Sequence, residues 1–152
     1  MPDTCVVLMK KEIGDIPFMG DFGRLSQDAV FIDRQKHKDA IGALNQAGQI
    51  IKERNASVFL YPEGTRTYQT TNDLLPFKKG VFHLAVGSHL PILPIVIESY
   101  HSISNFRNFV FRGGDIKVKI LPPISTEGLT AADVTDLSGK CYESSKKQQQ
   151  SK

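Results

Sequence analysis

Cysteine, tryptophan and long apolar runs are scarce in this sequence of 152 residues. It has no tryptophan and two cysteines, Cys5 and Cys141, which lie far apart without CxxC or Cys/His spacing around them. That pattern argues against a zinc site and favours free, reduced thiols on an intracellular protein. The longest apolar run, 90–97, contains two prolines and is too short to cross hydrocarbon. We therefore expect no transmembrane segment within this chain.

Common nucleotide-binding and hydrolase motifs are absent as well. There is no GxxxxGKS/T phosphate loop, no GxGxxG dinucleotide turn and no GxSxG nucleophile elbow, so kinase, dehydrogenase and serine hydrolase functions lose their main support. The net charge of +3 is mild and would suit a phosphate-bearing ligand or an anionic membrane surface. Because no dense basic stripe is interleaved with aromatic residues, we expect no nucleic-acid binding.

Short apolar runs alternate with helical periodicity along the chain. Runs rich in β-branched or aromatic residues predict buried strands, and apolar residues that recur every three or four positions predict helices. The predicted strands are 5–9, 29–32, 58–61 and 92–97, and the predicted helices are 39–54 and 79–88. Alternation of strand and helix is typical of an α/β domain.

The C-terminal third carries two further signals. Residues 116–120 alternate strictly between apolar and basic, which predicts an outer strand of the sheet with one solvated face. Thr130 and Asp133 have the spacing of a capping box, with Asp in place of the usual Glu. They predict a terminal helix that runs through Val134 and Leu137.

Domain limits follow from these elements. At 152 residues the chain fits one domain, which we place at 1–142. Serine, lysine and glutamine dominate 143–152, so we expect a disordered polar tail there. Because the chain starts almost directly on the strand at 5–9, we also expect the domain to be incomplete at its N-terminus.

A strand leads directly into a polar loop at 62–66, which reads Pro-Glu-Gly-Thr-Arg. Open α/β folds bind ligands at the ends of their strands. Arg66 could hold a phosphate through paired donors, with Lys78 or Lys79 in support. The alternative is a glycine turn with solvated charges, and spacing alone does not choose between the two interpretations.

Three segments in this order resemble the motifs of a known family. They read Phe-Ile-Asp-Arg at 31–34, Tyr-Pro-Glu-Gly-Thr-Arg at 61–66 and Pro-Ile-Leu-Pro-Ile-Val at 91–96, with further likeness at 10–12, 75–85 and 121–124. The series is similar to the lysophosphatidic acid acyltransferase family of the phospholipid and glycerol acyltransferase superfamily. Chance assembly of such a series is very unlikely, so the resemblance outweighs a generic α/β domain.

The resemblance implies a fold, a reaction and a location. The fold is a glycerol-3-phosphate acyltransferase-like domain with a mixed central sheet flanked by helices. The reaction moves an acyl group from acyl-coenzyme A to lysophosphatidic acid and forms phosphatidic acid in phospholipid biosynthesis, with no cofactor besides acyl-coenzyme A as co-substrate. The family is membrane-associated, usually through helices upstream of these motifs, and for a eukaryotic-type member the endoplasmic reticulum is the expected address.

The resemblance also assigns roles to individual residues. Glu63 and Gly64 would belong to the catalytic site, with Glu63 either contacting the glycerol or fixing Arg66. Arg34 and Arg66 would hold the acceptor phosphate, because a planar guanidinium suits paired phosphate oxygens. Substrate-binding roles fall on Arg34, Thr65, Arg66, Lys10, Lys11 and Pro94.

Each assignment has a plain structural alternative. Asp33 and Arg34 could form an ordinary ion pair at a strand end, and Lys10 and Lys11 could be solvated. The segment 91–96 has no reactive side chain, so it is better explained as a buried strand in which a proline shapes the site.

The family's catalytic motif, His-x-x-x-x-Asp, does not occur in this sequence. In that motif the histidine acts as general base and the aspartate orients it. Five residues beyond the four histidines stand Gly42, Ser88, Pro94 and Phe106. His83, on the stripe of a predicted helix, is expected to be a packed or capping residue rather than a substitute base.

Three explanations for the missing motif remain open: a truncated reading frame or fragment, a shortened isoform, and a degenerate paralogue. The strong likeness from Cys5 onward favours the first. We therefore expect the parent protein to be the acyltransferase and this chain alone to be inactive. The alternative is a non-catalytic module that binds lipid phosphate.

Overall fold

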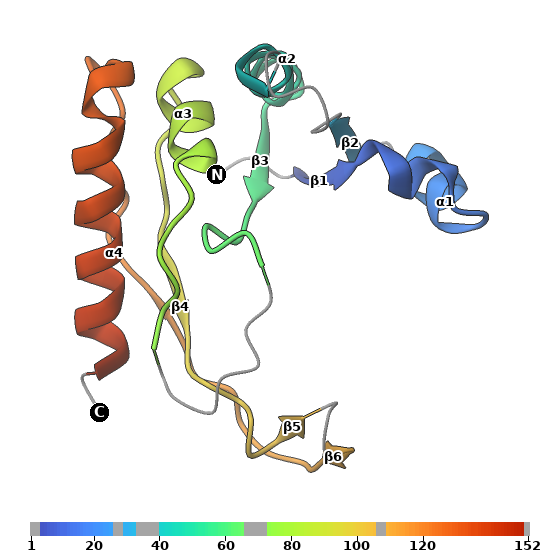
Figure 1. Cartoon of the computed structure of the whole chain (residues 1–152), viewed down its shortest axis with the longest axis vertical. Coiled ribbons are helices and arrows are strands. Elements are labelled where there is room, and N and C mark those ends of the chain that lie inside the picture. Colours follow the sequence, from blue (N-terminus) through green and yellow to red (C-terminus); the bar gives the residue numbers. More distant parts are fainter. Residues whose placement is uncertain (1–3, 26–28, 33–39, 66–72, 106–108, 151–152) are drawn as a thin grey trace.

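The computed structural model describes residues 4–25, 29–32, 40–65, 73–105 and 109–150 and has an α/β architecture, as the sequence predicts (Figure 1). Strands and helices alternate up to residue 87, and short strand pairs and a long helix follow. The elements are β1 Thr4–Lys10, η1 Lys11–Asp15, α1 Met19–Leu25, β2 Ala29–Ile32, α2 Ala40–Glu53, β3 Ala56–Phe59, α3 Gly80–Gly87, β4 Ile95–Ile97, β5 Ser104–Asn105, β6 Val110–Phe111, β7 Val118–Ile120, η4 Ala131–Asp133 and α4 Val134–Gln150.

The first half is built around a three-stranded parallel sheet with the order β2-β1-β3. In this sheet Val7 of β1 is the partner of Ala29 in β2 and of Phe59 in β3. Val6 is buried on one face, while Val7 and Phe59 are exposed on the other. Because side chains alternate across a strand, β1 and β3 each combine buried with exposed residues, instead of being buried throughout as the sequence predicts.

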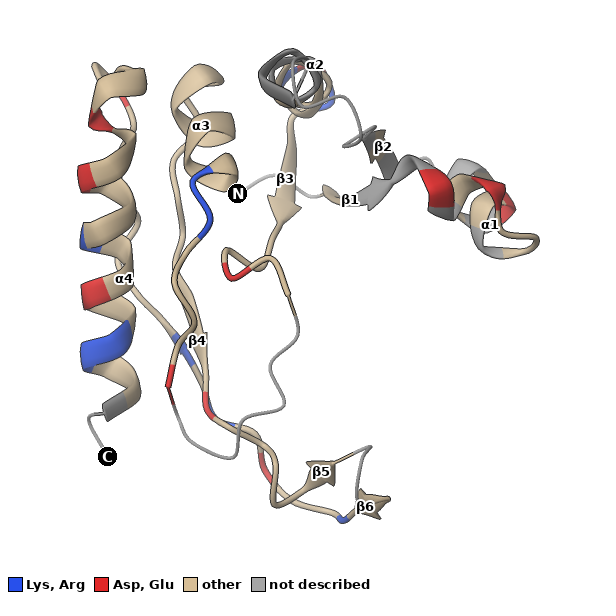
Figure 2. Cartoon of the chain, in the orientation of Figure 1, with Lys and Arg blue, Asp and Glu red and all other residues tan. Residues whose placement is uncertain are grey.

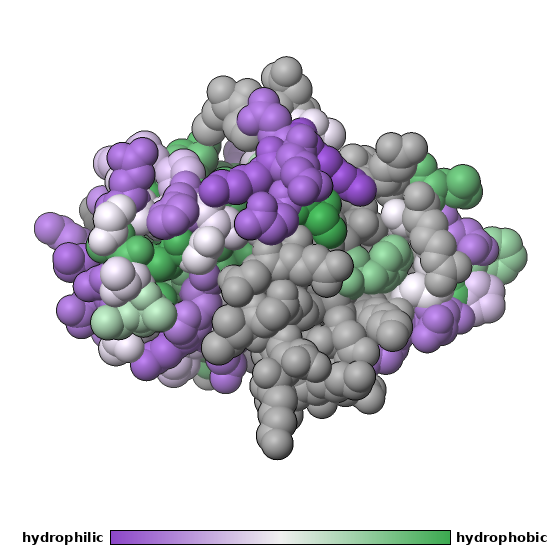
Figure 3. Space-filling model, turned by 90° about the horizontal axis from the view of Figure 1, so that it is seen from above, coloured by the Kyte–Doolittle hydropathy of each residue, from purple (hydrophilic) through white to green (hydrophobic). Residues whose placement is uncertain are grey.

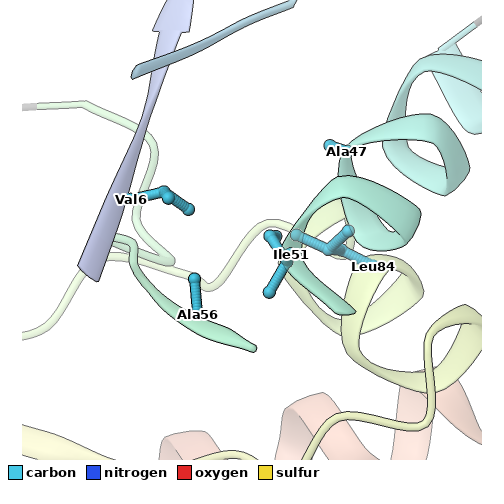
Figure 4. Packing of buried hydrophobic residues seen from close by; sticks show 5 residues of the cluster. All are labelled: Val6, Ala47, Ile51, Ala56 and Leu84. Atoms are coloured by element: carbon cyan, nitrogen blue, oxygen red, sulfur yellow. The ribbon is translucent and has the colours of Figure 1, made fainter. Parts of the chain in front are cut away.

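Helix α2 covers the buried face of the sheet. Its side chains Ala47 and Ile51 lie four residues apart and therefore on one side of the helix. They pack with Val6, with Ala56 and with Leu84 of α3 in a first hydrophobic cluster (Figure 4). The apolar periodicity of the predicted helix 39–54 is thus explained by packing on strands β1 and β3 and on helix α3.

Helices α2 and α3 pack closely at one glycine. A methyl group added at Gly48 of α2 would overlap Ser88 Oγ and lie 2.9 Å from Ser88 Cβ. Ser88 itself is buried just after the end of α3. The absence of a side chain at residue 48 is therefore what lets the two elements approach each other.

Helix α3 lies between α2 and α4 and contacts both (Figure 1). Its Phe82 and Val86 point away from the first cluster and pack with residues of the C-terminal helix. This second hydrophobic cluster consists of Phe82, Val86, Val134, Leu137 and Cys141. One face of α3 thus packs in the first cluster and the opposite face packs in the second.

Strands of the second half pair outside the parallel sheet. β4 and β7 form an antiparallel pair in which Val96 faces Lys119, and β5 pairs with β6. The run predicted as a strand at 92–97 contains a single bridge at Ile92 and then β4. The alternating segment 116–120 forms β7, whose partner is β4. In the described residues these strands form separate small sheets.

The C-terminus differs from the sequence prediction. The capping box forms as expected, because Asp133 Oδ2 accepts hydrogen bonds from the Thr130 N–H and hydroxyl group at 2.8 Å each. The disordered tail expected at 143–152 is wrong for 143–150, because α4 continues to Gln150. Glutamate, lysine and glutamine are good helix formers, and the buried Ser145 keeps this part of the helix against the protein.

The polar character of the C-terminal segment is nevertheless retained on the helix surface. Acidic and basic residues alternate along the outer side of α4 (Figure 2). On the face seen in Figure 3, hydrophilic and hydrophobic residues of the described chain are interspersed. Of the helices that the structure describes, none combines the length and the apolar character that a membrane span requires.

Candidate functional site

The loop after β3 forms a tight turn. Gly64 N–H donates to the Tyr61 carbonyl oxygen at 3.1 Å and closes a four-residue turn that contains Pro62 and Glu63. Gly64 has a φ of 68°, in the left-handed region where a side chain is strained. The residue type at 64 is therefore fixed by the backbone of the turn.

Two hydrogen bonds join this turn to the segment 73–78, which leads into α3. The Leu75 N–H donates to Glu63 Oε2 at 2.9 Å, and the Lys78 N–H donates to the Pro62 carbonyl oxygen at 2.7 Å. Glu63 is half-buried, and a bond between a carboxylate and a backbone amide is stronger than one between neutral groups. We call this pair of hydrogen bonds the Glu63 clamp.

Lys78 lies directly over the turn. A Cβ atom added at Gly64 would meet Lys78 Cγ at 3.0 Å and Lys78 Cε at 3.9 Å. Its neighbour Lys79 is placed differently, because Lys79 Nζ donates to Thr135 Oγ1 of α4 at 2.9 Å. The two lysines, which sequence analysis treated as equivalent, thus face different parts of the protein.

Only part of the predicted site lies within the described residues. Glu63, Gly64 and Thr65 belong to the turn and its exit, and Thr65 is exposed. Arg34 and Arg66 lie outside the described residues, so their phosphate-binding roles stay predictions.

Lys10 and Lys11 occupy the end of β1 and the start of η1, at the edge of the sheet where β1 and its partner β2 end. Carboxyl ends of parallel strands are the usual place for a ligand. Pro94 directly precedes β4, and its carbonyl oxygen accepts a hydrogen bond from the Leu121 N–H, just after β7, at 3.0 Å. The substrate-binding roles of all three residues stay predictions.

Two side chains with a shifted pKa, those of Cys141 and Asp133, lie far from the turn in the sequence. Burial raises the pKa of the Cys141 thiol from 9.0 to about 11. Hydrogen bonds from Thr130 lower the pKa of Asp133 below its ordinary 3.8. Neither group belongs to the candidate site.

No metal site is formed by the described residues, in the sense of three or more His, Cys, Asp or Glu side chains gathered together. His83 is half-buried in α3, between Phe82 and Leu84. Sequence reasoning missed the Leu75 N–H as partner of Glu63, since a backbone donor leaves no trace in the residue type.

Comparison with known proteins agrees with this architecture. The structure is similar to the crystal structure of the 1-acyl-sn-glycerophosphate (LPA) acyltransferase PlsC from Thermotoga maritima, with a TM-score of 0.66 and 21% sequence identity over 95% of this chain and 57% of that chain. At this identity the likeness shows the fold alone, an α/β fold shared with that acyltransferase.

Sequence comparisons identify the family. The family model described as Acyltransferase matches residues 1–98, and the chain belongs to that family. It is 44% identical over 131 residues to an uncharacterized acyltransferase of Schizosaccharomyces pombe, covering 86% of this chain and 47% of the relative. It is 39% identical over 139 residues to the 1-acyl-sn-glycerol-3-phosphate acyltransferase of Saccharomyces cerevisiae, covering 91% and 46%.

A human protein is similar to the chain to the same degree. The chain is 39% identical over 144 residues to human 1-acyl-sn-glycerol-3-phosphate acyltransferase beta, covering 93% of this chain and 50% of the relative. The chain therefore spans about half the length of the curated relatives it matches. The resemblance found in the motifs at 31–34, 61–66 and 91–96 is thus confirmed at the level of the family.

Proposed function

We propose that the protein to which these residues belong is a lysophosphatidic acid acyltransferase, and that this chain supplies the part of the site that receives the acceptor phosphate. The observation that carries the proposal is the turn at 61–64, which the Glu63 clamp joins to the segment bearing Lys78. This turn is the Tyr-Pro-Glu-Gly-Thr-Arg motif of the sequence, and the curated relatives bear the matching enzyme name.

The proposed reaction requires a base that this sequence does not provide in the family's form. The acceptor hydroxyl oxygen bonds to the thioester carbonyl carbon of acyl-coenzyme A, the carbon–sulfur bond breaks, and the hydroxyl proton passes through the base to the departing thiolate. No histidine in these 152 residues is followed five positions later by aspartate. We propose that this chain alone transfers no acyl group.

Membrane association, an address at the endoplasmic reticulum and the use of acyl-coenzyme A belong to the same proposal. They fit an acceptor and a product that are both membrane lipids. A second candidate, a non-catalytic module that binds lipid phosphate, is favoured by one observation, the lack of the His-x-x-x-x-Asp pattern in a chain that keeps the turn at 61–64.

Binding of vesicles by the 152-residue chain tests the acceptor site. We expect phosphatidylcholine vesicles that contain lysophosphatidic acid to be bound in preference to vesicles that contain monoacylglycerol, which lacks the phosphate. Arg66→Ala should weaken this preference about tenfold, because one charged hydrogen-bonding group is lost. Arg112→Ala, at an exposed arginine after β6, is the matched control. Equal binding of the two vesicle types would contradict the proposal.

Turnover separates the two candidate functions. The isolated chain, mixed with acyl-coenzyme A and lysophosphatidic acid, should form no phosphatidic acid. A full-length protein that binds lysophosphatidic acid but forms no product would favour the non-catalytic module. Turnover by the isolated chain that disappears in His83→Ala would assign the base to His83 and overturn our expectation.

A further inference from the structure

Two adjacent lysines precede α3, and the structure gives them different surroundings. The Lys79 ammonium group is occupied by its hydrogen bond of 2.9 Å to Thr135 Oγ1 on α4. The Lys78 side chain is exposed and runs over Gly64, with its Cγ 3.0 Å and its Cε 3.9 Å from where a Cβ of residue 64 would stand. Within the described parts of the chain no carboxylate forms an ion pair with Lys78. Its ammonium group is therefore presented beside the turn.

The charge of Lys78 suits an anionic group at this turn. A lysine ammonium is a compact, strongly hydrated charge with three donors, and it can bind a phosphate oxygen as a point charge. Gly64 has no side chain to separate the Lys78 stem from the backbone of the turn. A larger residue at 64 would push the lysine outward, so the glycine serves both the backbone conformation and the approach of the lysine.

The Glu63 clamp fixes the segment from which Lys78 projects. Glu63 Oε2 accepts from the Leu75 N–H at 2.9 Å, and the Pro62 carbonyl oxygen accepts from the Lys78 N–H at 2.7 Å. These two bonds hold both ends of a four-residue stretch against the turn. With its carboxylate engaged in this way, Glu63 positions the lysine through the backbone.

We propose that Lys78, rather than Lys79, binds the phosphate of the lysophospholipid acceptor and that Glu63 is the residue that positions it. This inference rests on the proposed function, and it names a binding residue and a positioning residue for the same site. It also assigns Glu63 a role other than contact with the glycerol.

The lysine assignment is tested with three variants of the chain in the vesicle assay. Lys78→Ala should weaken binding to vesicles containing lysophosphatidic acid about tenfold, as expected for loss of one charged hydrogen bond. Lys79→Ala, the matched control, should change it less than about twofold, because exposed charges elsewhere contribute little. Lys78→Arg should retain most of the binding. Vesicles with monoacylglycerol should bind equally weakly to all variants.

The outcomes separate the inference from the proposed function. If Lys79→Ala weakens binding as much as Lys78→Ala, or if neither does while lysophosphatidic acid is still preferred, the lysine assignment is wrong and the proposed function stands. If the unaltered chain shows no preference for lysophosphatidic acid, both are wrong.

The positioning role of Glu63 has a separate readout. Glu63→Gln keeps a carbonyl oxygen that can accept from the Leu75 N–H, so it should bind lysophosphatidic acid nearly as well as the unaltered chain. Glu63→Ala should weaken binding, and combining it with Lys78→Ala should add little, because both changes remove the same contact. Additive losses, or failure of Glu63→Gln to restore binding, would overturn the positioning role. Urea unfolding of each variant monitors the fold.

Discussion

The two hydrophobic clusters are built from different ranges of the chain, and α3 belongs to both. The first joins strands β1 and β3 to α2 and to Leu84, so its members lie between residues 6 and 84. The second joins Phe82 and Val86 to residues 134–141 of α4, about fifty residues further along the chain. Residues 82 and 86 share one face of α3, and residue 84 lies on the opposite one.

The candidate site depends on both clusters. Its turn follows β3, which contributes to the first cluster. The segment at 73–79 contacts α4, which contributes to the second cluster. The Tyr142 hydroxyl donates to the Leu74 carbonyl oxygen at 3.3 Å, and the Tyr142 ring packs edge-on against Phe77 with centroids 5.2 Å apart. The polar turn is thus positioned by two hydrophobic clusters that meet at one short helix, α3.

The largest effect is expected in α3 itself. Leu84→Ala removes a side chain that is only 2% exposed, and it should lower the free energy of unfolding by about 2–5 kcal/mol. Urea unfolding followed by circular dichroism measures the change. Val118→Ala, at a residue that is 55% exposed, should cost less than about 1 kcal/mol. Equal losses for the two variants would contradict the assignment of Leu84 to the core.

Substitution of alanine for two helical glycines should change the stability of the protein in opposite directions. Gly48→Ala places a methyl group against Ser88 and should destabilise the protein by about 1–3 kcal/mol through overpacking. Gly139→Ala in α4 has nothing within 4 Å of the added carbon, so it should stabilise by up to about 1 kcal/mol through helix propensity. Thermal unfolding measures both.

The glycine comparison has a direct check. Ser88→Gly should recover part of the loss caused by Gly48→Ala, because it removes the atoms that the new methyl group meets. A stabilising effect of Gly48→Ala would show that α2 and α3 are less closely packed than described.

The second cluster should weaken at alkaline pH because of Cys141. Burial raises the pKa of this thiol to about 11, so the neutral form stabilises the fold fully below pH 9 and that contribution is lost as the pH rises toward 11. The urea concentration at the midpoint of unfolding should fall across that pH window. It should fall less in the Cys141→Ala variant, which lacks the thiol.

The two cysteines provide a further contrast. The exposed Cys5 should react with a thiol reagent in the folded protein, and Cys141 only after unfolding. Equal rates of modification at neutral pH would contradict the buried position of Cys141.

The smallest effect is expected at the start of α4. Hydrogen bonds from Thr130 lower the pKa of Asp133, so this residue stabilises the fold above its ordinary value of 3.8, and the contribution is lost as the pH falls through the lowered value. Asp133→Asn should therefore flatten the acid side of the stability profile slightly. An unchanged profile would show that the capping box contributes nothing measurable.

Much of the fold could be predicted from the sequence, because helix and strand periodicity is local. The predicted helix 39–54 corresponds to α2 within one residue at each end, and 79–88 corresponds to α3. The prediction of a disordered tail was wrong for 143–150, because composition suggested disorder whereas α4 continues to Gln150 and Ser145 on it is buried. The pairing of strands could not be predicted from sequence either, because β4 and β7 pair across twenty residues of intervening chain.

The site was predicted in part. The motif at 61–66 marked the turn and the glycine, because a left-handed backbone position favours that residue type. It did not indicate which atoms Glu63 engages, nor whether Lys78 or Lys79 faces the turn. Arg34 and Arg66 keep the roles that the resemblance implies, as predictions.

By itself the sequence determined the family, the order of β1, β2, α2, β3 and α3 and the position of the turn, since motifs and periodicity are properties of short segments. Only the tertiary structure decided that Glu63 binds the Leu75 amide, that Lys79 reaches Thr135 and that Lys78 lies over Gly64. The physical reason is that these contacts join segments which packing of α3 against two separate cores brings together.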